Sequence, residues 1–226
     1  SGAGRRADYG LFCLVRVAQL LRVWAKDVIV VIFWTLAAFF LGSLPFSVWI
    51  GRRTSGEDIR SVGDKNPGAT NVLRSGGFLP FSLALFLDIS KGALPVGLAY
   101  YVFGLQDWRI VPIALAPPLG HAFSPFLNWR GGKAIAATLG VWIGLTIWVV
   151  PLVGTLLLIV WSLLIRPSGW AVLITLVGVL VFIIFWNPQP EFMLVIGGQI
   201  VLLFWKHRQD LRQRPTLRIS GKQGSR

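Results

Sequence analysis

The sequence of 226 residues is 54% hydrophobic, with a mean hydropathy of +0.67, and its charged residues lie in short blocks between long apolar runs. This pattern excludes an ordinary soluble globular protein and indicates a membrane protein. Basic loops orient membrane proteins and contact anionic lipids, so the formal net charge of +13 does not call for a nucleic-acid partner, and we expect none. The single cysteine, Cys13, excludes an intrachain disulfide and a thiolate metal cluster.

Residues 1–27 form the first of three predicted regions, a basic amphipathic segment. Its polar residues from Arg16 to Lys26 recur at spacings of three, three and four, while apolar residues take other positions around the helix. Such a helix lies in the plane of the lipid headgroups. Residues 28–205 form the predicted transmembrane domain, and residues 206–226 form a basic tail.

The transmembrane domain contains seven apolar stretches that approach the roughly 20 residues needed to cross about 30 Å of hydrocarbon. They cover residues 28–50, 78–104, 109–127, 134–150, 152–165, 169–187 and 191–205. The fifth is too short to cross unaided, so it tilts little, stops at an interface, or forms a bent pair with the fourth around Pro151. We therefore expect an all-α, polytopic membrane protein of about seven transmembrane helices, with an interfacial helix before them.

Lysine and arginine residues in the loops predict the orientation. Fifteen lie on one face, in loop 51–77, in loop 128–133, at Arg166 and in the tail, whereas the other face has only Arg109 once the N-terminal segment is set aside. The positive-inside rule then places the fifteen and the C-terminus in the cytoplasm.

The polar segment Gly63–Val72 is a candidate anion-binding loop. Its small residues expose backbone N–H groups beside amide, hydroxyl and ammonium donors, as a phosphate cradle requires. The alternative is an ordinary turn that uses Asn-Pro-Gly for its geometry.

A second candidate is the segment 130–133, Arg-Gly-Gly-Lys, which opens an apolar helix where a phosphate is favoured. It is not a nucleotide-binding Walker A motif, because Leu127 and Ala134 occupy the required glycine and hydroxyl positions; the alternative is a turn with orienting charges.

Asp88 and Lys91 lie within an apolar stretch, three residues apart and so on one helix face. Intramembrane charges usually serve function, although a structural ion pair is the competing interpretation.

Ser43 and His121 lie at the ends of spans, where each is either a packing residue or a ligand. Neither histidine is followed by an aspartate at the spacing of the His-x4-Asp acyltransferases, and no Gly-x-Ser-x-Gly motif is present. An enzyme of this kind would need a substrate that arrives activated.

Taken in order, these segments resemble the bacterial acyl-phosphate:glycerol-3-phosphate acyltransferases. The resemblance is carried by the residues 42–46 (Gly-Ser-Leu-Pro-Phe), 58–60 (Asp-Ile-Arg), 66–74 (Asn-Pro-Gly-Ala-Thr-Asn-Val-Leu-Arg), 88–92, 120–121, 131–133 and 207–208. It implies transfer of a fatty acyl group from acyl phosphate to the 1-hydroxyl of glycerol 3-phosphate at the bacterial inner membrane. The products are lysophosphatidic acid and inorganic phosphate, and no metal or cofactor takes part. The active site would face the cytoplasm.

The resemblance also implies roles for individual residues. Ser43, His121 and Lys133 would be catalytic, with Ser43 and His121 orienting the substrates and Lys133 binding a phosphate. The phosphate-binding residues would be Arg60, Asn66, Gly68, Thr70, Asn71, Lys91, Gly131, Gly132, His207 and Arg208. The base for the attacking hydroxyl would be substrate phosphate or His121. A protein that keeps this scaffold without catalysis, as a transporter or anion-binding membrane protein, is the alternative function.

The chain departs from the family pattern at three places. Asp64 stands where the family has serine in the phosphate loop, and a carboxylate there repels a phosphate unless Lys65 neutralises it or the side chain points away. Ala134 replaces a glycine after the lysine of the Gly-Gly-Lys segment, which removes a permissive backbone position. In the tail, Asp210 stands where the family has asparagine, and Ile219 where it has glutamate.

Overall fold

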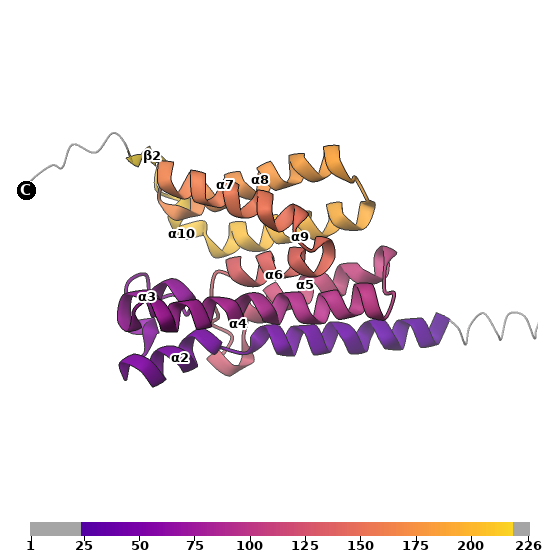
Figure 1. Cartoon of the computed structure of the whole chain (residues 1–226), viewed down its shortest axis with the longest axis horizontal. Helices are drawn as coiled ribbons and strands as arrows, with labels where there is room; N and C mark the ends of the chain where they lie inside the picture. Colours follow the sequence, from indigo (N-terminus) through magenta and orange to yellow (C-terminus); the bar gives the residue numbers. More distant parts are fainter. Residues whose placement is uncertain (1–23, 219–226) are drawn as a thin grey trace, which may run out of the picture.

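The structure is a computed structural model that describes residues 24–218 (Figure 1). It is almost entirely helical, as predicted. After a first helix over 24–43, the α-helices are α2 (Phe46–Ser55), α3 (Ala69–Gly76), α4 (Phe78–Gly97), α5 (Ile110–Ala122), α6 (Ile135–Thr146), α7 (Val149–Leu164), α8 (Ser168–Trp186), α9 (Pro190–Lys206) and α10 (Arg208–Leu211). The shorter elements are η1 (Ile59–Ser61), the π-helical η2 (Leu98–Val102), η3 (Asp107–Arg109), η4 (Pro125–Leu127), and the strands β1 (Ile165–Arg166) and β2 (Thr216–Leu217). The predicted N-terminal amphipathic segment lies outside the described residues, apart from 24–27, which begin the first helix.

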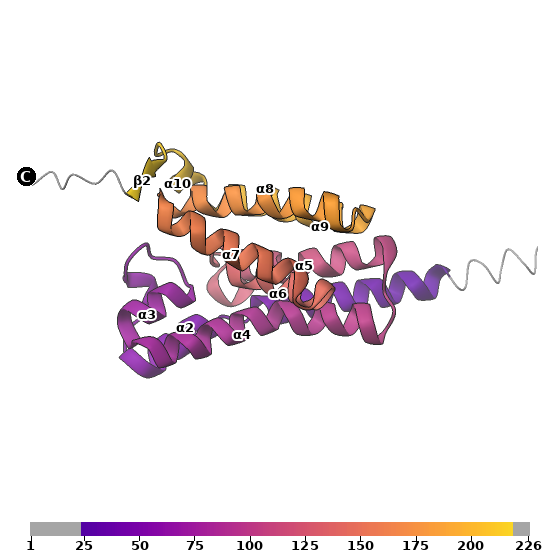
Figure 2. The ribbon, with the colours of Figure 1, turned by 45° about the horizontal axis from the view of Figure 1, so that its top comes forward.

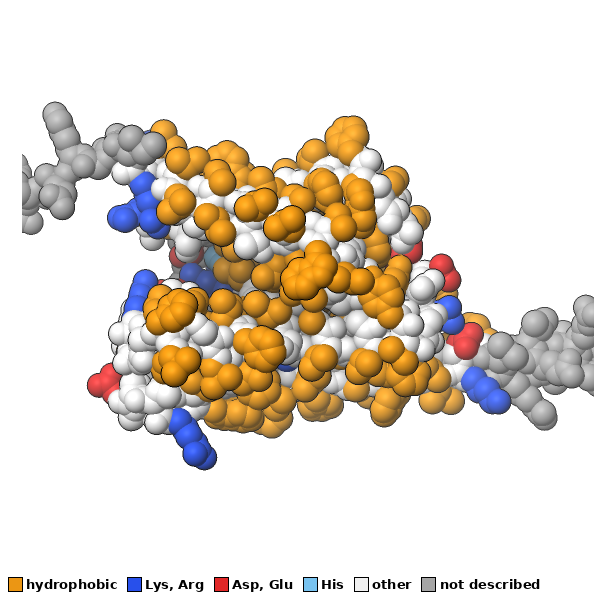
Figure 3. Space-filling model, in the orientation of Figure 1, with side chains coloured by type: hydrophobic (Ala, Val, Ile, Leu, Met, Phe, Trp, Pro, Cys, Tyr) orange, Lys and Arg blue, Asp and Glu red, His pale blue; other side chains and the backbone are white. Residues whose placement is uncertain are grey.

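Several of these helices are built to cross a bilayer. The stretches Trp24–Ser55, Phe78–Val102, Asp107–Leu127 and Ser168–Trp186 are long and apolar enough to do so, whereas α6 and α7 are shorter apolar helices. Large hydrophobic side chains cover most of the face shown in Figure 3, and many are exposed. Because water would disfavour such a surface and lipid would not, the bundle is a multi-pass membrane protein.

Three of the predicted spans differ from the observed helices. The span expected over 28–50 is interrupted at residues 44–45, because Pro45 has no N–H to continue the helical hydrogen bonds, and α2 starts afresh beyond it. The fourth and fifth predicted spans correspond to α6 and α7, which are separated at Ile147 and Trp148. This break lies just before Pro151, which falls in the first turn of α7, where a missing N–H is tolerated.

Helix α4 packs closely against α6 in the middle of the bundle. A Cβ atom on Gly92 of α4 would overlap the carbonyl oxygen of Ala137, and one on Gly140 of α6 would overlap that of Ile89. Small residues therefore let the two backbones meet, as in many membrane helix pairs. In Figures 1 and 2, α2, α3 and α4 lie on one side of the molecule and α7, α8 and α9 on the other, with α5 and α6 between them.

The polar loops gather at one end of the bundle. Loop 56–68, loop 128–134 and α10 lie at the end opposite η3 (Figure 1). Strand β2 of the tail pairs in antiparallel fashion with β1, between α7 and α8, with Ile165 opposite Leu217. This short pairing, which the sequence did not predict, holds the described part of the tail beside the start of α8.

Candidate functional site

Loop 56–68 is organised at its start by an aspartate. Asp58 caps η1 by accepting a hydrogen bond from the Arg60 backbone N–H (3.0 Å), and its carboxylate also binds the guanidinium groups of Arg60 (2.6 Å) and Arg52 (2.8 Å). The hydrogen bonds from Arg60, and then those from Arg52, hold the pKa of the Asp58 carboxyl well below its usual range against the opposing effect of burial. Arg60, a predicted phosphate ligand, is thus already paired, with 37% of its side chain exposed.

The second half of this loop is organised by Asn71. Its buried side-chain amide donates to the Asp64 carboxylate (3.0 Å) and the Asn66 carbonyl (2.9 Å), and its oxygen accepts from Arg74 (3.2 Å). Gly68 precedes the first turn of α3 and accepts from the Asn71 backbone N–H (3.0 Å). Asn71 therefore shapes the loop from inside. Of the other predicted cradle residues, Asn66 and Gly68 are partly exposed and Thr70 is exposed.

The segment 131–133 crosses directly over the end of α5. The Gly132 N–H donates to the His121 carbonyl (3.0 Å), and a Cβ atom on Gly132 would overlap the His121 ring. Lys206, at the end of α9, donates to the carbonyls of Gly131 (3.1 Å) and Ala122 (2.9 Å) and so fixes the segment from the other side. Lys206 was counted in the sequence only as an orienting charge, and its positioning role was missed.

Lys133 is the point at which three loops meet. Its ammonium nitrogen lies 3.1 Å from a carboxylate oxygen of Asp64 and 3.1 Å from one of Asp210, and Asp210 also accepts from the Ser168 hydroxyl at the start of α8 (3.3 Å). Burial raises the pKa of Asp64, but the hydrogen bond and charge of Lys133 outweigh it and leave that pKa below its usual range. Neither expectation for Asp64 was right, since its partner is Lys133 rather than Lys65, and it points into the site.

His207 lies beside this cluster, and Arg208 does not. The His207 ring is buried, with Nδ1 2.8 Å from the Leu203 carbonyl and Nε2 without a partner among the described residues. Burial lowers the pKa of this ring. Arg208 turns outward, stacks on the exposed Trp205 ring (4.7 Å) and donates to the Trp205 carbonyl (2.9 Å). The structure therefore does not bring Arg208 to the other predicted phosphate ligands.

Lys91 is enclosed within the membrane part of the bundle. Its ammonium binds Asp88 (2.7 Å) and the Leu44 carbonyl (2.9 Å), while Ser47 of α2 donates to the other oxygen of Asp88 (2.6 Å). The side chains of Lys91 and Asp88 are 1% and 2% exposed. This arrangement has the geometry of the structural ion pair that was the competing interpretation of the sequence, and it joins α4 to the break before α2.

Ser43 and His121 are also buried. Ser43 donates its hydroxyl to the Phe39 carbonyl (2.7 Å), and its own carbonyl accepts from the Ser124 hydroxyl (2.6 Å). His121 packs beneath Gly132, and its Nδ1 has no partner within residues 24–218. His121 thus supports the segment 131–133 from beneath, whereas Ser43 holds Ser124, just before η4.

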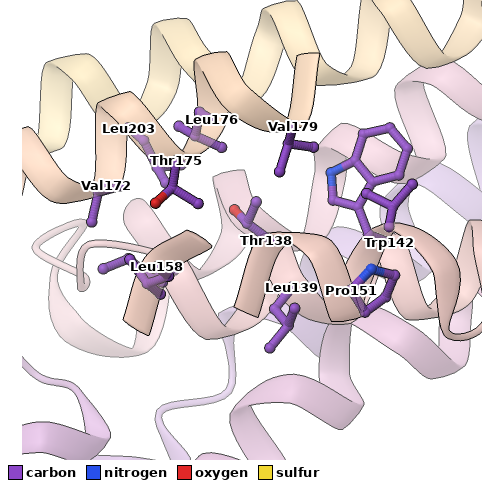
Figure 4. Close-up of a pocket in the computed structure, with 13 residues that line it drawn as sticks. Thr138, Leu139, Trp142, Pro151, Leu158, Val172, Thr175, Leu176, Val179 and Leu203 are labelled. Atoms are coloured by element: carbon purple, nitrogen blue, oxygen red, sulfur yellow. The ribbon is translucent and has the colours of Figure 1, made fainter. Parts of the chain in front are cut away.

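Residues near the Lys133 cluster (Lys133, Asp64 and Asp210) along the chain line two cavities. A polar cavity of about 750 Å³ is lined by Asp58, Arg60, Ser61, Lys65, Pro67, Leu127, Asn128 and Arg130. A narrow apolar cavity of about 60 Å³ lies among α6, α7, α8 and α9, and its lining begins at Ile135, two residues beyond Lys133 (Figure 4). Figure 3 shows the hollow at the polar end of the bundle, with charged and histidine side chains inside it. The chain on either side of the Lys133 cluster thus contributes to a cationic recess and to a separate apolar slot.

Known proteins share both the sequence and this fold. The family described as glycerol-3-phosphate acyltransferase matches residues 32–214. A glycerol-3-phosphate acyltransferase of Maridesulfovibrio salexigens is 40% identical over 193 residues, covering 80% of this chain and 92% of that protein. One from Methylobacillus flagellatus is 35% identical over 181 residues, covering 79% and 90%.

Solved structures agree. The glycerol 3-phosphate form of PlsY (YgiH), an integral membrane glycerol 3-phosphate acyltransferase, superimposes with a TM-score of 0.73 at 29% identity. Its lysophosphatidic acid form gives 0.71 at 27%, and each comparison covers 80% of this chain and 90% of the other. The chain belongs to the glycerol-3-phosphate acyltransferase family.

Proposed function

We propose that this enzyme transfers a fatty acyl group from acyl phosphate to the 1-hydroxyl of glycerol 3-phosphate, at the cytoplasmic face of the bacterial inner membrane. The observation that carries the proposal is the Lys133 cluster, where three polar segments meet and whose neighbours along the chain line a cationic recess and an apolar slot. Such a junction suits a reaction between a water-soluble phosphate and a lipid acyl donor.

The chemistry needs little beyond placement. The hydroxyl oxygen attacks the acyl carbonyl carbon, the bond from that carbon to the phosphate oxygen breaks, and phosphate leaves with the electron pair. Because a mixed anhydride carries a good leaving group, the protein must mainly align the reactants and stabilise the developing oxyanion. In this proposal Lys133, Arg60 and His207 bind the phosphates, and Asn66, Gly68, Thr70 and Asn71 form the loop around one of them.

The remaining predicted residues take supporting roles. His121 holds the segment 131–133 and Ser43 holds Ser124, while Lys91 holds α4 to the start of α2. His121 lies beneath Gly132 rather than in the open cleft, which favours a phosphate oxygen of the substrate as acceptor of the hydroxyl proton. Arg208, turned toward Trp205, contacts the membrane interface.

A direct assay tests the reaction. Purified protein in detergent, supplied with palmitoyl phosphate and glycerol 3-phosphate, should release phosphate and form lysophosphatidic acid in equal amounts. Lys133→Ala should abolish both products, whereas Lys26→Ala, the same change on the exposed first turn of helix 24–43, should not. Phosphate release without the lipid, or flux of glycerol 3-phosphate across vesicles without acyl transfer, would contradict the proposal.

The apolar slot would receive part of the acyl chain. Its walls are almost wholly apolar, and the hydroxyls of Thr138 and Thr175, which line it, have no hydrogen-bond partner in the described part of the chain (Figure 4). Gly154→Leu should fill the slot and raise the KM for palmitoyl phosphate more than that for decanoyl phosphate. Gly197→Leu, also a helical glycine but with open space at its Cβ, is the matched control. An equal effect of Gly154→Leu on both donors would exclude the slot.

The orientation can be tested separately. Fifteen lysine and arginine residues of the sequence fall at the end of the bundle that holds Lys133 or in the adjoining tail, which supports a cytoplasmic placement of that end. A cysteine introduced at Thr70 in a Cys13→Ser background should react with a membrane-impermeant maleimide only in inverted vesicles. Labelling in intact spheroplasts instead would reverse the orientation.

A further inference from the structure

Lys133 is occupied in the free protein by two carboxylates. An ammonium group has three N–H donors, and Asp64 and Asp210 take two of them at 3.1 Å each. A phosphate that binds Lys133 must therefore share the ammonium with these carboxylates or displace one. Both carboxylates are departures from the pattern that the chain otherwise resembles, in which the two positions are neutral.

The two carboxylates are held differently. Asp210 is 22% exposed, accepts from the Ser168 hydroxyl, and lies against Gly169 in the first turn of the 19-residue α8. A carboxylate at the N-terminus of a helix is stabilised by the unpaired N–H groups there. Asp64 is 49% exposed and is held through its other oxygen by Asn71 and the Asn66 backbone N–H (3.3 Å). Asp64 is thus the member that can leave Lys133 while remaining bound to its own loop.

The geometry points to Asp64 as an affinity-setting residue: its carboxylate is a tethered competitor that holds the Lys133 ammonium until a substrate phosphate takes its place. Asp210 stays and keeps the ammonium aligned. When the phosphate takes the place of Asp64, one ion pair at Lys133 is exchanged for another, so the ammonium stays paired. The free energy of phosphate binding is reduced by the free energy of the Asp64–Lys133 pair that has to break. This inference rests on the proposed binding of a substrate phosphate at Lys133.

The strength of a half-exposed pair gives the size of the effect. One exposed ion pair typically changes an equilibrium constant by a factor of about 1.4 to 5. Asp64→Asn keeps an oxygen for Asn71 and removes the charge, so it should lower the KM for glycerol 3-phosphate by roughly two- to fivefold, with kcat within twofold. Asp107→Asn, the same change on an exposed aspartate at the opposite end of the bundle, should leave both constants unchanged.

A double-mutant cycle tests whether Asp64 acts through Lys133. The dissociation constant of glycerol 3-phosphate, measured calorimetrically without acyl donor, should fall for Asp64→Asn but not when Lys133→Ala is also present. An unchanged or raised constant for Asp64→Asn overturns the inference, and so does an equal fall in the Lys133→Ala background. Because binding is measured without turnover, a failure of the acyl-transfer reaction would be seen separately in the product assay.

Discussion

The buried pair of Asp88 and Lys91 gives a prediction that separates stability from catalysis. Lys91→Met would leave the Asp88 carboxylate almost fully enclosed, with the Ser47 hydroxyl as its remaining side-chain partner. Removing one partner of a buried ion pair costs about 3–5 kcal/mol, because the other charge stays desolvated and uncompensated. At about 2–4 °C per kcal/mol for a chain of this size, the melting temperature should fall by about 6–20 °C.

The measurement is thermal unfolding in detergent, followed by tryptophan fluorescence. The double variant Asp88→Asn/Lys91→Met removes both charges and keeps an oxygen for Ser47, so it should recover part of the loss. It should not recover all of it, since the Leu44 carbonyl also loses its donor, at about 1–3 kcal/mol. Lys26→Met, on an exposed turn, is the control.

Two results would refute this reasoning. One is a melting temperature of Lys91→Met within about 2 °C of the parent protein, which would place the desolvation cost of Asp88 far below the buried-pair range. The other is a double variant no more stable than the single one. Full stability together with lost acyl transfer would return Lys91 to the role of a phosphate ligand.

Three further predictions concern the loops. Gly132→Ala should displace the His121 ring and reduce kcat at least tenfold. Gly197→Ala, whose Cβ meets open space, should leave the activity unchanged. Equal activities of the two variants would show that the His121 ring can move aside at no cost. Ala134→Gly should raise the free energy of unfolding by roughly 1 kcal/mol, because Ala134 has a φ of 63°; a lower melting temperature would contradict this. The depressed pKa of Asp58 means that its pairing stabilises loop 56–68 well above pH 3.8 and is lost as the pH falls through the folded-state pKa. Protection factors for amide exchange in that loop, which are corrected for the intrinsic exchange rate at each pH, should therefore fall in acid, and Asp58→Asn should show low protection at neutral pH as well. An acid response retained in Asp58→Asn would assign it to another group.

The helices could be predicted from the sequence because lipid imposes a simple rule. Long apolar runs satisfy their backbone hydrogen bonds only as helices, so each of the seven predicted stretches falls on a helix. Where the sequence prediction failed, packing or local geometry decided the outcome. The helix breaks at residues 44–45 rather than continuing to residue 50, and α6 ends at Thr146.

The sequence names individual candidate residues of the site, but it does not give the contacts between them. The loss of a permissive position at Ala134 is confirmed, since that residue has a left-handed backbone. The partner of Asp64 could not be predicted, because Lys133 lies 69 positions away along the chain, and Asp210 lies a further 77 beyond it. The charge pattern of the sequence identifies residues that need a partner of opposite charge. The packing of α4, α6 and α9 determines which partner each of them contacts.

The short length of α6 has a consequence for how two immiscible reactants meet. Twelve residues of helix span about 18 Å, which is well short of the roughly 30 Å of hydrocarbon in a bilayer. Because α6 lies in the middle of the bundle and Lys133 comes just before its first turn, the short helix allows the polar site to lie deeper in the bundle than the ends of the longer helices around it. A charged solute can then approach the depth at which an acyl carbonyl rests, so neither reactant has to be extracted from its own phase.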